Sequence, residues 1–136
     1  MNNLDHHIIH EEKCEIGDIV LRNDKILMFK PFKDVNTCSI DHLKEMHNIF
    51  LDLTKGVPHL YFSDNSRNSK LGIGSAEKTF INNTIHEFAK ACAVSEDSAL
   101  VRYMSHSFLY LYKPKIPIKL FKTEEDSINW LKSLEL

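Results

Sequence analysis

The sequence has no excess of basic residues and no basic block. It carries 17 basic and 19 acidic residues, and its formal net charge at pH 7 is -2. A nearly neutral protein has no general electrostatic attraction to nucleic acid, and without a basic block it has little to hold an anionic membrane. We therefore expect no nucleic acid among the partners of this protein.

Closely spaced cysteines and long apolar runs are also missing. Cys14, Cys38 and Cys92 form no CxxC motif, and their odd number leaves at least one thiol free. This pattern fits a reducing compartment best. The N-terminal residues are polar and rich in histidine, unlike a secretory signal, and no window approaches the roughly 20 apolar residues of a membrane span. The sequence predicts a soluble, cytoplasmic protein.

The length and composition of the chain are those of one ordinary domain. Of its 136 residues, 43% are hydrophobic and 26% are charged, which is enough to bury a core without disulfides or metal. The sequence shows no internal repeat, linker or low-complexity segment. We divide the chain into a flexible N-terminal segment, residues 1–13, and a single α/β domain, residues 14–136.

Short β-prone runs bounded by turn residues predict five strands. The first two flank residues 22–24, whose turn chemistry predicts a hairpin. The brief run of small residues at 91–94 is typical of a central strand that helices cover closely on both faces. The predicted strands span residues 15–21, 25–30, 57–62, 91–94 and 118–121.

Four stretches with apolar residues at helical spacing follow or separate these strands. We expect Ser39, Ser75 and either Asp97 or Ser98 as N-caps, and Thr123 opens the last helix with the outline of a capping box. The predicted helices span residues 40–54, 75–89, 97–112 and 123–134. The order ββαβαβαβα predicts a mixed, mostly parallel five-stranded sheet with four helices and right-handed crossovers.

Several segments carry a family resemblance. They are the run KACAV at 90–94, FLYLYKP at 108–114, PIKLF at 117–121 and EDSINWLK at 125–132. These segments resemble small bacterial STAS-like proteins, which are single-domain relatives of the sulfate-transporter and anti-anti-sigma-factor antagonist fold. The resemblance covers roughly residues 15–134 and implies a STAS-like fold. Many members of this group have no assigned function.

The resemblance also implies a switch region. In STAS-type antagonists the loop after the third strand carries a Ser or Thr at a helix start, and its phosphorylation switches binding to a partner kinase. The corresponding stretch here is residues 64–75, with Ser75 at the expected helix start and Gly72-Ile73-Gly74 in place of the family's acidic and serine residues. The implied partner-binding or switch residues are Asp64, Ser66, Ser69, Gly72, Gly74 and Ser75.

No catalytic motif stands out. A GxSxG elbow is absent, and linear spacing supports no Ser-His-Asp or Cys-His-Asn arrangement. His6, His7, His10 and Cys14 have metal-capable side chains, but a structural zinc site needs four fixed ligands and a polar tail fixes none. The two glycines before Ser75 form either an anion-binding loop or, more commonly, an ordinary capped turn. We predict a protein that is not an enzyme and that has no metal or cofactor.

The helix at 97–112 is richer in aromatic residues and methionine than one buried stripe needs. Part of this surface is expected to be exposed, which suits a protein partner or a homodimer. The preferred hypothesis is therefore a non-enzymatic STAS-like regulatory or protein-interaction module. The alternative is a carrier of a small molecule or lipid, with an apolar cavity between helices 97–112 and 40–54 and the sheet. The candidate residues for its apolar groove are Met104, Phe108 and Tyr112.

Overall fold

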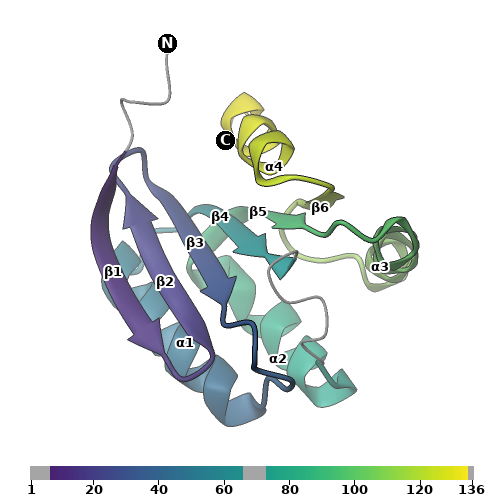
Figure 1. Ribbon diagram of the computed structural model, residues 1–136, viewed down its shortest axis with the longest axis horizontal. Helices are drawn as coiled ribbons and strands as arrows, with labels where there is room; N and C mark the ends of the chain where they lie inside the picture. Colours follow the sequence, from purple (N-terminus) through teal and green to yellow (C-terminus); the bar gives the residue numbers. More distant parts are fainter. Residues whose placement is uncertain (1–6, 66–72, 135–136) are drawn as a thin grey trace.

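One mixed sheet organises the fold (Figure 1). The computed structural model describes residues 7–65 and 73–134, and for residues 106–112 it describes only the course of the helix. Within these ranges, six strands lie in the order β1-β2-β3-β4-β5-β6. Neighbouring strands from β1 to β3 are antiparallel, and those from β3 to β6 are parallel. The strands are β1 (Ile8–Cys14), β2 (Gly17–Arg22), β3 (Ile26–Pro31), β4 (His59–Asp64), β5 (Ala89–Ser95) and β6 (Ile118–Phe121).

The predicted α/β fold is confirmed, and the sheet has a sixth strand where five were predicted. The additional strand, β1, lies mostly in the segment 1–13 that we expected to be flexible. All of its residues except Cys14 are exposed, so it lacks the apolar alternation that marks a half-buried strand. Its backbone nevertheless pairs with β2, from Ile8 opposite Arg22 to Cys14 opposite Gly17. An edge strand needs only this one neighbour, and its side chains need not be apolar.

Helices cover both faces of the sheet (Figure 1). α1 (Ile40–Thr54) and α2 (Ser75–Thr84) lie on one face, and α4 (Glu124–Ser133) lies on the other. Strands β3 to β6 follow one another across the sheet in chain order, so right-handed crossovers direct the connecting helices to the same side. α4 follows the last strand and is not bound by this rule. α3 (Ala99–Tyr112) lies beside β6 at the end of the sheet.

The predicted helix 75–89 is shorter in the structure. α2 ends at Thr84, whose hydroxyl donates to the Phe80 carbonyl at 2.8 Å, and a 3-10 turn, η3 (Ile85–Glu87), follows. β5 therefore begins at Ala89, earlier than the predicted residue 91. The helix does not reach residue 89 because this segment pairs with β4. The His59 N–H donates to the Phe88 carbonyl at 2.8 Å, and this bond belongs to the sheet.

Three of the predicted helix starts are confirmed. Ser39 Oγ accepts from the His42 N–H at 3.2 Å, and His42 Nδ1 accepts from the Ser39 N–H at 3.1 Å, which completes a capping box. Ser98 Oγ accepts from the Val101 N–H at 3.2 Å. Thr123 Oγ1 accepts from an N–H in the first turn of α4 at 3.1 Å. These bonds satisfy N–H groups that a helix start otherwise leaves unpaired.

Alternation along the strands divides the buried residues into two cores. On β3, Phe29 faces α1 and α2, and the preceding residue, Met28, faces α4. On β5, Ala91 and Ala93 are fully buried under α4 next to Leu131. Their small side chains let α4 approach the sheet closely, which confirms the prediction for the run 91–94.

An ion-pair network ties α4 to the turn between β2 and β3. The side chain of Arg22 is only 7% exposed, and its Nε and Nη2 donate to the two carboxylate oxygens of Asp24 at 3.0 and 2.6 Å. Lys132 of α4 places its Nζ 3.3 Å from the same carboxylate. Burial alone would raise the pKa of Asp24, but the hydrogen bonds and charges of Arg22 and Lys132 lower it below its usual value.

Replacement of Asp24 by Asn is expected to destabilise the fold by about 3 kcal/mol, because it leaves the buried Arg22 charge without its carboxylate. Urea unfolding followed by circular dichroism measures this difference. Since the native pKa of Asp24 is lowered, its contribution is present above about pH 4 and is lost as the pH falls through the native pKa. The gap between wild type and D24N should therefore shrink in acid.

The matched control for this prediction is Asp18→Asn. Asp18 pairs at 2.9 Å with Lys13, whose side chain is 71% exposed, and an exposed pair of this kind contributes about 1 kcal/mol or less. Equal destabilisation by D18N and D24N would contradict the role given to Asp24.

Candidate functional site

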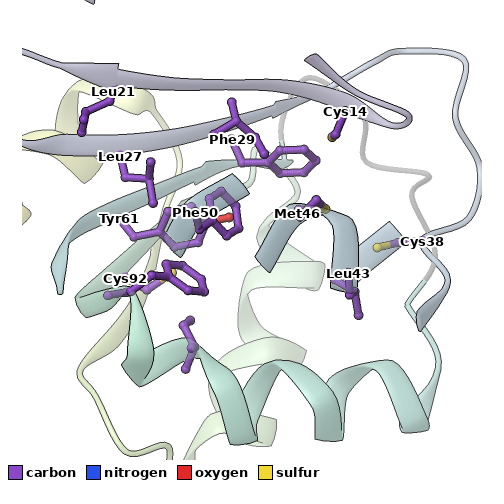
Figure 2. Packing of buried hydrophobic residues seen from close by; sticks show 14 of the residues in the cluster. Cys14, Leu21, Leu27, Phe29, Cys38, Leu43, Met46, Phe50, Tyr61 and Cys92 are labelled. Carbon is purple, nitrogen blue, oxygen red and sulfur yellow. The ribbon is translucent and has the colours of Figure 1, made fainter. Parts of the chain in front are cut away.

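The face of the sheet under α1 and α2 contains a cavity of about 210 Å³. Side chains of β3, β4, β5 and β6 form its floor, and α1, α2 and η3 form its walls. Figure 2 shows part of this lining, with Phe29, Tyr61 and Cys92 on the sheet and Met46 and Phe50 on α1. The lining is almost wholly apolar, and the cavity is partly open. This cavity is the candidate functional site.

The cavity exists because α1 and α2 bury their apolar residues to different extents. α1 buries Leu43, Met46 and Phe50, which form one stripe at helical spacing. α2 has no fully buried residue, and its Phe80 and Ile81 are only half-buried. The apolar residues of α2 therefore border a hollow instead of filling a core.

Aromatic rings make up one side of the lining. The centroids of Phe50, Tyr61 and Phe88 lie 4.4 to 5.3 Å apart. His47 meets Phe80 and Phe88 in edge-on contacts at 6.2 and 5.8 Å. Most of these pairs have the edge-to-face geometry that aromatic rings prefer, so each ring helps to fix its neighbours. A molecule in the cavity would therefore contact the faces and edges of aromatic rings whose positions are fixed by their contacts with neighbouring rings.

Polar side chains of the lining lie at the end of β4, on α1 and on α2. Tyr61 and Ser63 are alternate residues of β4, and Ser63 Oγ donates to Asn65 Oδ1 at 3.4 Å. His47 Nε2 on α1 lies 3.5 Å from a Glu87 carboxylate oxygen. The Nδ1 atom of His47 is buried and has no hydrogen-bond partner among the described residues.

Burial raises the pKa values of the thiols and the phenol of the lining further above neutral pH. It raises the pKa of Cys38 to about 11, with further contributions from Cys14 and Glu77, and raises the pKa of Cys92 to about 12. Burial also raises the pKa of Tyr61 well above its ordinary value. Because only the thiolate is a strong nucleophile, neither cysteine of the lining is activated for covalent chemistry.

Three of the six predicted switch residues lie within the described residues. Asp64 ends β4, and its carboxylate accepts a hydrogen bond from Ser95 Oγ of β5 at 2.8 Å. Gly74 is the N-cap of α2 and Ser75 is its first helical residue, so the predicted cap is displaced by one position. The other three lie outside the described residues: Ser66, Ser69 and Gly72.

The start of α2 favours the ordinary capped turn over the anion-binding loop. A Cβ atom added to Gly74 would meet Glu77 Oε1 at 2.6 Å, so a carboxylate of the same helix already lies at this end. The helix dipole favours that carboxylate, and its charge would repel a second anion.

Of the predicted apolar groove on α3, the one residue whose side chain is described, Met104, does not line the cavity. Met104 is 61% exposed, and so are large parts of Leu100 and Tyr103, at 68% and 72%. The side chains of Phe108 and Tyr112 lie outside the described residues. The cavity is bounded by α2 where we expected the helix 97–112. Over the part of the chain that the structure describes, no helix combines the length and the apolarity that crossing a bilayer requires.

Three of the four N-terminal metal-capable residues are described by the structure, and they do not form a ligand group. His7 and His10 are exposed, Cys14 is buried with its Sγ donating to the Gly17 carbonyl at 3.2 Å, and His6 lies outside the described residues. Across the described ranges, no group of three or more His, Cys, Asp or Glu side chains is arranged to hold a metal ion.

None of the predicted site residues that the structure describes lines the cavity. Phe80 and Ile81, two apolar residues of the predicted helix 75–89, both border the cavity. The signal available in the sequence was the sparse apolar stripe of this helix, which has too few large residues to close a core. Spacing along the chain does not show how far a helix lies from a sheet.

Comparison with known proteins identifies a family and a fold. The family model described as Domain of unknown function (DUF7793) matches residues 19–135. The crystal structure of an uncharacterised protein of the DUF3478 family from Shewanella loihica PV-4, with a SpoIIAA-like fold, matches with a TM-score of 0.57. The two share 14% sequence identity over 96% of this chain and 98% of that chain, so the likeness concerns the fold alone. No curated protein matches. The predicted STAS-like fold is confirmed.

The raised pKa values predict that the thiols of the native protein react slowly. At pH 8, a thiol with a pKa of about 11 has about a hundredfold less thiolate than one with the ordinary value of 9.0. Alkylation of Cys38 and Cys92 by iodoacetamide, followed by peptide mass spectrometry, should be at least that much slower in native protein than in urea. Equal rates in the two states would contradict the buried, protonated lining.

Proposed function

The chain belongs to the family described as Domain of unknown function (DUF7793), and from that premise we propose that it is a non-enzymatic, STAS-like binding module. Its ligand is a small apolar molecule, taken up in the cavity between α1, α2 and the sheet. The observation that carries the proposal is this cavity of about 210 Å³ with an almost wholly apolar lining.

The apolar lining supports an occupant. Because the cavity is partly open, water reaches a lining that is almost wholly apolar. An apolar ligand removes its own surface and that of the lining from water, which is favourable by about 25 cal/mol per Å² of apolar surface buried.

The chemistry of the lining supports binding over catalysis. Burial moves the pKa values of Cys38, Cys92 and Tyr61 further above neutral pH, whereas general acids and bases work best with pKa values near the operating pH. Thr84 Oγ1 is engaged with the Phe80 carbonyl at 2.8 Å. These groups support a site that holds a molecule without changing it.

The substitution Val94→Phe tests the proposed function. Val94 is a half-buried cavity residue of β5, so the larger ring should fill part of the hollow. Toluene added to the wild-type protein should cause saturable shifts in the amide NMR spectrum. V94F should weaken this binding by about tenfold or more. The control V57F makes the same chemical change at a residue that is 59% exposed, and it should leave the affinity unchanged within about twofold.

Two results would contradict the proposed function. One is the absence of saturable toluene binding to the wild-type protein, and the other is unchanged binding in V94F. Circular dichroism checks that each variant is folded. If V94F does not fold, Thr84→Leu fills the cavity from α2, because Thr84 also lines it.

A second candidate function is self-association or protein interaction through α3. The observation that favours it is the cluster of exposed apolar side chains on the first half of α3. This cluster contains Leu100, Val101, Tyr103 and Met104, which are 41% to 72% exposed. Contiguous apolar surface of this kind is typical of interaction sites. The region around Asp64, Gly74 and Ser75 remains a predicted partner contact of the same module, with Ser75 as its predicted switch residue.

Sedimentation equilibrium tests the second candidate. If α3 mediates a homodimer, the double variant Leu100→Lys/Met104→Lys should raise the dimer dissociation constant by about tenfold or more, because it places charge in an apolar interface. The control Val57→Lys, at an exposed residue outside α3, should have no effect. A wild-type protein that stays monomeric at every accessible concentration would exclude the homodimer.

A further inference from the structure

The size of the cavity limits its ligand to a compact molecule. A protein cavity of about 150 Å³ lined by Leu, Ile and Phe is known to bind benzene. In proportion, a cavity of about 210 Å³ holds about eight non-hydrogen atoms, which is one substituted ring or two small fused rings. A long acyl chain of a lipid exceeds this volume, so part of the chain would extend out of the open side. The aromatic walls formed by Phe50, Phe80 and Phe88 suit a ring, which gains edge-to-face contacts there.

The charge of the lining limits the ligand to a neutral molecule. Among the described residues that line the cavity there is no Lys, Arg, Asp or Glu. His47 of the lining places its Nε2 3.5 Å from a Glu87 carboxylate oxygen. A carboxylate placed among the apolar groups would lose its hydration without gaining an opposite charge, and this loss is large. A fatty acid would bind only with its carboxylate and part of its chain outside the cavity, which leaves less of its apolar surface buried.

The end of β4 offers one place for a polar group of the ligand. Ser63 and Asn65 both line the cavity, and the contact between Ser63 Oγ and Asn65 Oδ1 is long, at 3.4 Å. An amide oxygen has two lone pairs, so Asn65 Oδ1 can accept a second hydrogen bond. A ligand N–H or O–H at this end would find an acceptor there, while the remainder of the ligand meets apolar groups.

From these three constraints we infer the ligand class, an inference that rests on the proposed function of the same cavity. The ligand is a neutral, compact aromatic molecule with a single N–H or O–H group that donates to the Ser63–Asn65 end of the cavity. The apolar body supplies the affinity, and the single donor fixes the orientation of the molecule.

The matched probes indole and indene test the ligand class. They have nearly the same shape, but only indole carries an N–H donor. Calorimetric titration of the full chain should show indole binding about fivefold more tightly than indene, as one neutral hydrogen bond provides. Decanoate, which is anionic and long, should show no saturable binding.

The substitution Asn65→Ala should abolish the preference for indole and leave the affinity for indene within about twofold. The control Asn83→Ala removes an exposed amide from α2 and should keep the preference. Ser63→Ala is the second test variant at the same end of the cavity. A preference that survives both N65A and S63A would overturn the assignment of the donor site.

The remaining outcomes separate this inference from the proposed function. Equal affinity of wild type for indole and indene, or tighter binding of decanoate, would overturn the ligand class while leaving a cavity that binds apolar molecules. Failure of all three probes to bind would overturn the proposed function and the ligand class together.

Discussion

The chain order of the parallel strands is the constraint on which the rest of the structure depends. β3, β4, β5 and β6 lie side by side in sequence order, and right-handed crossovers then direct α1 and α2 to one face of the sheet. α1 packs onto that face with a buried stripe, and α2 does not. The cavity is the space that this difference leaves over the floor of the sheet. The opposite face has no crossover helix among the described residues before β6, and α4 covers it.

The two faces of the sheet also differ in their chemistry. On the α4 side, fully buried alanines bring helix and sheet together, and the network of Arg22, Asp24 and Lys132 joins α4 to the hairpin. On the α1 and α2 side, neutral and aromatic side chains surround a hollow. The charged groups of this network therefore lie on the other face of the sheet from the cavity. This separation suits a site that discriminates by shape and by a single hydrogen bond.

The sequence predicts the fold better than it predicts the site, and particular residues show why. Ser39 and Thr123 cap helices through bonds between near neighbours in the chain, so local patterns suffice to locate them. β1 was missed because its side chains are exposed and only its backbone pairing makes it a strand. The extent of α2 was overestimated because the pairing of His59 with Phe88 begins the sheet there. The cavity brings together Phe29, Phe80 and Ile118 from distant elements, and spacing along the chain cannot measure the gap between them.

The central claim is that the space between α1, α2 and the sheet is a real apolar cavity that accepts a molecule. A crystal of the protein under xenon pressure tests this claim most directly, because xenon enters apolar cavities of about 150 Å³ and scatters strongly. The account predicts a xenon peak among Phe50, Phe80 and Ile81. A map in which side chains fill this space and no xenon binds there would contradict it.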